Sequence, residues 1–235
     1  MLKEINFSAL FIQRRPFILI SGLIILLILV LENINSRFSM SDFEVYYYAA
    51  QSFLGDHQVY GHQFGGENTG FYKYSPFALF FFIPISLLPV VVAKVFSFLL
   101  IGVATVSVLL ISAHLFKDVT EKKSGFNNWM LVIVAIVACS RMHRELHMGN
   151  VNMILLLMLL LILWFTLHGK QVMSGVLFAI VLFIKPHFII LAPLFLLRKQ
   201  YVLLAVALAG IIVEIMSPAF FIGVTGNWEL HRDWA

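Results

Sequence analysis

Residues 76–116 read PFALFFFIPISLLPVVVAKVFSFLLIGVATVSVLLISAHLF, and Lys94 is the only Asp, Glu, Lys or Arg among them. The part from 90 to 116 is long enough to cross a bilayer core of roughly 30 Å as one helix, which needs about 20 residues. The part from 77 to 89 is bounded and interrupted by prolines, and at about 1.5 Å per residue it covers only about 20 Å. This stretch predicts a membrane protein whose number of crossings depends on how 77–89 is counted.

The composition extends this prediction to the whole chain. Hydrophobic residues make up 61% of the 235 residues, charged residues only 12%, and the mean hydropathy is +0.95, far from the average of soluble domains. The net charge of +4 comes from scattered Lys and Arg residues, so nucleic acid is not an expected partner. The single cysteine, Cys139, excludes an internal disulfide framework and a cysteine-based metal site.

The distribution of basic residues favours seven crossings, with 77–89 as a short re-entrant helix in the outer leaflet. In that arrangement nine Lys and Arg residues lie on the cytoplasmic side and six on the far side, whereas an eighth crossing makes the count eight on each side. Cytoplasmic loops normally carry the excess of positive charge. We therefore expect an all-α, polytopic bundle that forms one membrane-embedded domain over residues 1–235. The apolar runs are 16–34, 77–89, 90–116, 129–140, 151–167, 172–184, 186–197 and 201–223.

The seven-span arrangement also places the polar segments on one face of the membrane. These segments are 35–75, 141–152, 185–187 and 226–235. A functional site would need such convergence, and an eighth span would divide the segments between two compartments.

A pair of carboxylates follows the first apolar run, in the sequence SDFEVYYY at 41–48. Asp42 and Glu44 would point to different faces of a helix but to the same face of an extended segment. They suit a general base and a supporting acid, although a hydrated pair at the membrane surface is an equally good interpretation. Tyr46 and its neighbours also fit an interfacial aromatic belt.

The densest polar cluster is RMHRELHMGNVN at 141–152. His143 and His147 are four residues apart and would share a helix face, but the glutamate stands at the wrong offset for the metalloprotease motif. Arg141 and Arg144 suit phosphate recognition, because a guanidinium pairs with two phosphate oxygens at once. Plain topological charges explain them as well.

Lys185-Pro186-His187 interrupts a further apolar run. A cation at that depth either extends to the surface or meets an anion. The proline breaks the helix and frees backbone groups that a ligand can use. Tyr74 lies in a stretch of tyrosines and a lysine before the 77–89 run, which suits contact with a lipid headgroup or an ordinary interfacial anchor.

Four short motifs, taken in order, resemble one known family. They are Asp42-Phe43-x-x-Tyr46, Tyr74-Ser75-Pro76, Gly149-Asn150-Val151-Asn152 and Lys185-Pro186. Their order and spacing resemble the family 87 glycosyltransferases, which are polytopic, mostly bacterial enzymes of the GT-C type. The resemblance runs from about residue 16 to 230. The family's Gly-Gln-x-Asn has Asn150 here in place of the glutamine.

This resemblance implies an inverting glycosyltransferase at the outer face of the bacterial plasma membrane. It implies that Asp42 is the catalytic base, with Glu44 as its neighbouring acid. A hexose, expected to be mannose, would move from a polyprenyl-phosphate donor to a lipid or glycan acceptor. Cations are available to stabilise the leaving phosphate, so no metal ion or other cofactor is expected. The expected substrate-binding residues are Tyr46, Tyr74, Arg141, His143, Arg144, His147, Asn150, Asn152, Lys185 and His187.

A non-catalytic membrane protein is the alternative interpretation. Family members usually have more spans, so we expect the chain to be the N-terminal part of such an enzyme, a truncated remnant, or a subunit completed by another chain. A transporter-like protein is less favoured, because the sequence has no internal repeat.

Overall fold

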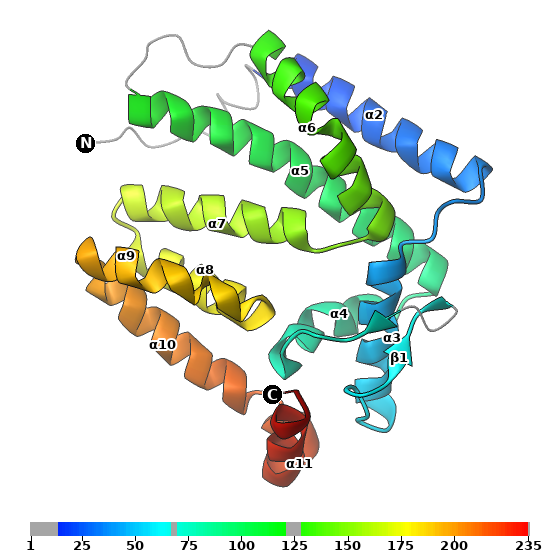
Figure 1. Ribbon diagram of the computed structural model, residues 1–235, viewed down its shortest axis with the longest axis vertical. Coiled ribbons are helices and arrows are strands. Elements are labelled where there is room, and N and C mark those ends of the chain that lie inside the picture. The colour runs from blue at the N-terminus through cyan, green and yellow to red at the C-terminus, as the bar shows by residue number, and fades with distance from the viewer. Residues whose placement is uncertain (1–13, 67–69, 121–127, 235) are drawn as a thin grey trace. The chain divides into compact units, whose positions relative to one another are not determined.

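The structure is a computed structural model that describes residues 14–66, 70–120 and 128–234. Helices dominate the described residues, and one two-stranded hairpin is added to them (Figure 1). The all-α prediction is therefore confirmed. In chain order the elements are α2 (Arg15–Ile34), α3 (Ser41–Gly55), β1 (Gln63–Phe64), β2 (Gly70–Phe71), η2 (Pro76–Ala78), α4 (Leu79–Ser86), α5 (Val90–Thr120), α6 (Asn128–Met148), α7 (Asn152–Leu167), α8 (Gln171–Ile184), η3 (Pro186–Leu191), α9 (Ala192–Leu197), α10 (Tyr201–Met216) and α11 (Ala219–Trp234).

Two helices of the described residues are long and apolar enough to cross a membrane, α2 and the Val90–Phe116 part of α5. Two bent pairs raise the number to four if each pair is one span: α6 with α7, bent by 117°, and α10 with α11, bent by 89°. The structure thus supports a helical membrane protein, but the expected count of about seven spans is not confirmed.

Helix length explains this difference. The 14 residues of α8 reach about 21 Å at 1.5 Å per residue, short of a bilayer core of roughly 30 Å. The 77–89 run forms η2 and the eight-residue α4, which contains Pro84, so this element is short, as expected. Its depth in the membrane stays a prediction.

The chain divides into two compact units, each built from two separate stretches of sequence. One comprises residues 1–40 and 96–160, and the other comprises 41–95 and 161–235. We call them unit 1 and unit 2.

Unit 1 has a small apolar core between α2, α5 and α6. Phe17 of α2 is 4% exposed and packs with Leu109, Leu110 and Leu131. Gly102 allows α2 and α5 to approach, because a Cβ there would lie 2.9 Å from the Cγ2 of Ile25. The rest of α2 is mostly exposed: only 11% of its apolar window is buried.

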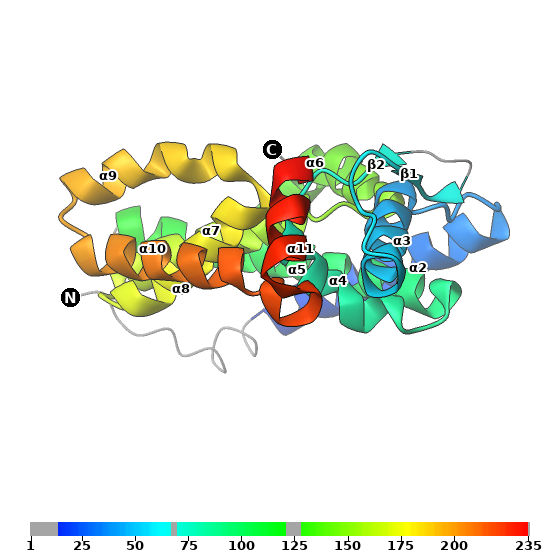
Figure 2. The same ribbon diagram turned by 90° about the horizontal axis from the view of Figure 1, so that it is seen from below.

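In unit 2, α8 and α10 pack face to face through small residues (Figure 2). A Cβ on Gly175 would lie 2.6 Å from the carbonyl oxygen of Leu203, and one on Gly210 would lie 2.7 Å from the Cβ of Ala179. Such close helix approach without bulky side chains is typical of membrane helix pairs.

Aromatic rings join α3, α4 and α11 in the same unit. The Phe53 ring lies 6.0 Å from Phe80 and 6.4 Å from Phe221, measured between ring centroids, and Phe80 lies 5.1 Å from Phe221. The antiparallel β1–β2 hairpin pairs Gln63 with Phe71 and lies beside α3 (Figure 2). These contacts fix α3, which carries the predicted catalytic acid.

Candidate active site

Helix α3 carries both predicted catalytic carboxylates in its first turn. The backbone N–H groups of a first turn have no partner within the helix, so negative side chains are stabilised there. Asp42 is half-buried, while Phe43 and Val45 on either side of Glu44 are buried. The sequence left open whether this segment is helical or extended. Its helical form turns Asp42 and Glu44 to different faces.

Asp42 shares a helix face with Tyr46, four residues later. The Tyr46 hydroxyl lies 3.1 Å from the Tyr74 hydroxyl, and the two rings are 5.3 Å apart. Burial raises the pKa of Tyr46, and the neighbouring Tyr74 and the negative charge of Asp42 raise it further. Tyr46 therefore stays protonated and acts as a hydrogen-bonding group rather than as a base. The structure brings three predicted residues together: Asp42, Tyr46 and Tyr74.

Two tyrosines that the sequence analysis did not select hold the Tyr74 segment in place. The Tyr60 hydroxyl donates to the carbonyl oxygen of Tyr74 at 2.7 Å, and the Tyr72 hydroxyl donates to that of Ser75 at 3.3 Å. Burial raises the pKa of both phenols, so both remain donors. The only sequence signal for this network was the density of tyrosines in the loop.

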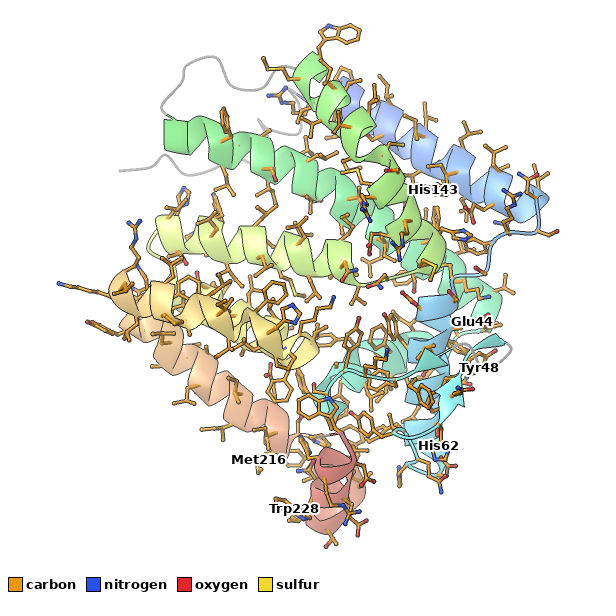
Figure 3. All side chains as sticks on the ribbon, viewed as in Figure 1. Glu44, Tyr48, His62, His143, Met216 and Trp228 are labelled. Atoms are coloured by element: carbon orange, nitrogen blue, oxygen red, sulfur yellow. The ribbon has the colours of Figure 1, made fainter. Side chains whose placement is uncertain are left out.

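Glu44, on α3 (Figure 3), makes two contacts that hold the neighbouring backbone in place. Its Oε1 lies 2.5 Å from the Nζ of Lys94, and its Oε2 accepts a 2.6 Å hydrogen bond from the backbone N–H of Gly66. Gly66 has little room, because a Cβ there would lie 3.1 Å from the same Oε2. Glu44 thus ties the start of α3 to the hairpin loop and to the first turns of α5.

Lys185 and His187 belong to unit 2, as Asp42 does. Lys185 is an extended residue between α8 and η3, with φ −139° and ψ 91°, and it is half-buried. His187 is exposed, and its ring lies 4.6 Å from that of Phe188. The break expected at Pro186 is present, since η3 begins there.

The cluster at 141–152 belongs to unit 1. Its two histidines share a face of α6, as the spacing predicts, and both contact one carboxylate of α2. Glu32 Oε1 lies 3.2 Å from His143 Nε2, and Glu32 Oε2 lies 2.8 Å from His147 Nδ1. Arg141 and Arg144 are exposed. Glu32 was not among the residues predicted from the sequence, although a glutamate at the end of an apolar run was a signal for it.

The asparagines of the cluster close the corner between α6 and α7. Gly149 takes a positive φ of 70°, a conformation that glycine adopts without strain. The Asn152 side chain donates to Glu145 Oε2 at 2.9 Å, and its backbone N–H donates to Asn150 Oδ1 at 3.3 Å. In this structure these asparagines organise the turn.

Within residues 14–66, 70–120 and 128–234, no three His, Cys, Asp or Glu side chains are arranged to hold a metal ion. Among these groups, His147 Nδ1 lies within hydrogen-bond distance of Glu32 Oε2, at 2.8 Å.

Comparison with known families then identifies the chain. The family described as Glycosyltransferase family 87 matches residues 71–234. The chain belongs to glycosyltransferase family 87. The resemblance expected from its motifs is thereby confirmed. The match contains Tyr74, the 141–152 cluster and Lys185, whereas Asp42, with the rest of α3, precedes it.

One relative of this family 87 chain comes from Corynebacterium glutamicum and is named Alpha-(1->3)-arabinofuranosyltransferase. The two are 31% identical over 93 residues, which cover 40% of this chain and only 21% of the relative. No solved structure matches the family 87 chain.

Proposed function

We propose that the chain is a membrane glycosyltransferase in which Asp42 is the general base. One observation carries this proposal: Asp42 stands in the first turn of α3, half-buried and one helical turn from the hydrogen-bonded Tyr46–Tyr74 pair. Membership of family 87 supports the class of reaction. The aromatic rings beside the carboxylate suit contact with the apolar face of a sugar.

The proposed reaction is an inverting transfer. Asp42 accepts the proton of an acceptor hydroxyl while that oxygen attacks the anomeric carbon of the donor sugar. The bond from this carbon to the donor phosphate breaks on the opposite side, and the phosphate leaves with the electron pair. A carboxylate within reach of the acceptor hydroxyl takes its proton as the new bond forms, and Asp42 is the carboxylate that shares a helix face with Tyr46.

The proposed donor is a sugar carried on a polyprenyl phosphate, and the acceptor is a lipid or glycan at the outer face of the membrane. The apolar helices α2 and α5 support a site at a bilayer. Arg141, Arg144 and Lys185 are the proposed groups that stabilise the departing phosphate, because cations aimed at developing negative charge lower the barrier. Tyr74 and His187 are proposed to contact the substrate.

Mannose is the sugar expected from the sequence, and arabinofuranose is a second candidate. Arabinofuranose is a candidate because the relative from Corynebacterium glutamicum is named for arabinofuranosyl transfer. That organism is a bacterium, which also supports a bacterial plasma membrane as the location. We propose further that units 1 and 2 serve a single glycosyltransferase domain, since neither is continuous in sequence.

The test is transfer of labelled sugar by membranes that contain the chain. Polyprenyl-phosphate mannose and polyprenyl-phosphate arabinofuranose are offered in parallel, and turnover is compared between the wild type and Asp42→Asn. The amide keeps the size of the side chain but does not accept the proton, so turnover should fall by about 10²–10⁴.

Asp56→Asn is the matched control. Asp56 lies just past the other end of α3, and its bonds go to Ser52 and Gln58, so this variant should keep wild-type turnover. Near-normal transfer by Asp42→Asn would refute the assignment of the base. Wild-type membranes that transfer neither sugar would favour a non-catalytic subunit.

A further inference from the structure

Unit 1 contains two cavities that meet at shared residues. The first is apolar, has a volume of about 200 Å³ and lies between α2, α5 and α6. The second is polar, has a volume of about 660 Å³ and lies where α2 ends beside the last turns of α6. Ile28 and His143 line both. The two cavities together form one amphipathic site, with an apolar interior and a polar mouth.

The apolar cavity suits one lipid chain. An apolar cavity of about 150 Å³ holds a benzene molecule, so a space of about 200 Å³ holds a short segment of a single acyl chain. Only 11% of the apolar window of α2 is buried, and its neighbour in a bilayer is lipid. The occupant of this cavity therefore comes from the surrounding bilayer.

One side of the polar mouth presents hydrogen-bond acceptors. Glu32 is only 7% exposed, and its carboxylate contacts Nε2 of His143 and Nδ1 of His147. An ionised carboxylate only accepts hydrogen bonds, so the imidazole nitrogens that face Glu32 carry the protons. In a neutral imidazole the second nitrogen is then an acceptor. With half to a third of their side chains exposed, at 48% and 34%, both rings are accessible to a ligand.

The other side of the mouth presents donors. Asn35, Arg37 and Ser39, which follow α2 in the chain, line the same polar cavity. A guanidinium beside an amide and a hydroxyl is a set of donors suited to phosphate oxygens. Apart from the two histidines, the mouth holds one positive charge, on Arg37, and one negative charge, on Glu32.

We propose that this site binds a phosphatidylethanolamine molecule of the bilayer. Its phosphodiester, with one negative charge, meets Arg37, and its ammonium N–H groups donate to the exposed nitrogens of His143 and His147. One acyl chain enters the apolar cavity. A phosphate monoester carries about 1.5 to 2 negative charges, which is more than one guanidinium beside a carboxylate balances. The proposal does not depend on the proposed glycosyl transfer.

The experiment compares two lipids that differ only in the ammonium group. The full chain is placed in vesicles with equal amounts of phosphatidylethanolamine and phosphatidylcholine, each with a photoreactive diazirine in its acyl chain. Phosphatidylcholine keeps the phosphate and the chains but has no ammonium N–H to donate. After irradiation, the cross-linked peptides are mapped by mass spectrometry. We expect cross-links on the α2, α5 and α6 residues that line the apolar cavity, with phosphatidylethanolamine favoured by about fivefold, since occupancy follows relative affinity.

Three variants separate the parts of the site. Glu32→Gln and His147→Phe should remove the preference for phosphatidylethanolamine, because each disturbs the acceptors of the mouth. Arg37→Gln should lower labelling by both lipids, because both carry the phosphate. His168→Phe is the matched control, since this histidine belongs to unit 2 and should leave the preference unchanged.

A cavity-filling variant tests the position of the chain. Ala135 lines the apolar cavity, so Ala135→Trp should reduce cavity cross-links from both lipids. If a substitution prevents folding, the comparison of the two lipids on the wild type still tests whether the site prefers phosphatidylethanolamine. Equal labelling by both lipids would overturn the proposal. Displacement of the label by polyprenyl phosphate at a lower mole fraction than phosphatidylethanolamine would also overturn it and would assign the site to the lipid that glycosyl transfer releases.

Discussion

The ion pair between Glu44 and Lys94 offers a quantitative test of how α3 is held. Their side chains are only 16% and 14% exposed, so replacing one partner leaves the other charge in a site that water scarcely reaches. Loss of one partner of a buried pair costs about 3–5 kcal/mol. Because Glu44 keeps its hydrogen bond from Gly66 when Lys94 is replaced, we expect a cost just below that range, about 2–3 kcal/mol for Lys94→Met.

The measurement is equilibrium unfolding in mixed micelles, followed by tryptophan fluorescence. Lys94→Met and Glu44→Gln should each lower the free energy of unfolding, and the double variant should lose less than their sum, by about 1–3 kcal/mol. Arg232→Gln is the control, because its pair with Asp233 is exposed at 64% and 53% and should contribute under about 1 kcal/mol. A Lys94→Met protein as stable as the control, or strictly additive losses in the double variant, would refute the inference that this pair holds α3.

Three further outcomes are expected. Arg144→Gln should weaken donor binding and slow transfer together, with little rescue by Arg144→Lys; unchanged steady-state kinetics would place the phosphate elsewhere. Gly175→Val should destabilise unit 2 by about 1–3 kcal/mol through the steric clash between α8 and α10, whereas Gly22→Ala, which meets nothing within 4 Å, should be neutral or mildly stabilising in the same unfolding assay. Tyr46→Phe should cost about 1 kcal/mol through loss of its hydroxyl contact, and a stability equal to that of the wild type would argue against that contact.

Local features of the site could be predicted from the sequence. The position of Asp42 after the first apolar run, the shared face of His143 and His147, and the break at Pro186 all follow from spacing and residue type. The sequence also indicated the family through its motifs. The shared face of His143 and His147 and the break at Pro186 were confirmed because each depends on residues within a few positions of one another.

Contacts between residues that are distant in the chain could not be predicted in this way. Lys94 was noted as a cation within an apolar run, but its pairing with Glu44 requires the packing of α5 against the start of α3. Glu32 meets His147 across 115 positions, and Tyr46 meets Tyr74 because the hairpin returns the chain to α3. The count of about seven spans was not confirmed, because apolar composition does not reveal where a helix bends or ends.

The contact of Phe221 with Phe53 and Phe80 has a consequence for the order of folding. About 170 residues separate Phe53 from Phe221, and at about 5–20 residues per second the ribosome needs roughly 10–30 s to make them. During that interval α3 has been synthesised, but the α11 residue Phe221 that packs against Phe53 has not. Biogenesis of this protein therefore includes a waiting period, in which the insertion machinery or a chaperone must shield the helix that carries Asp42.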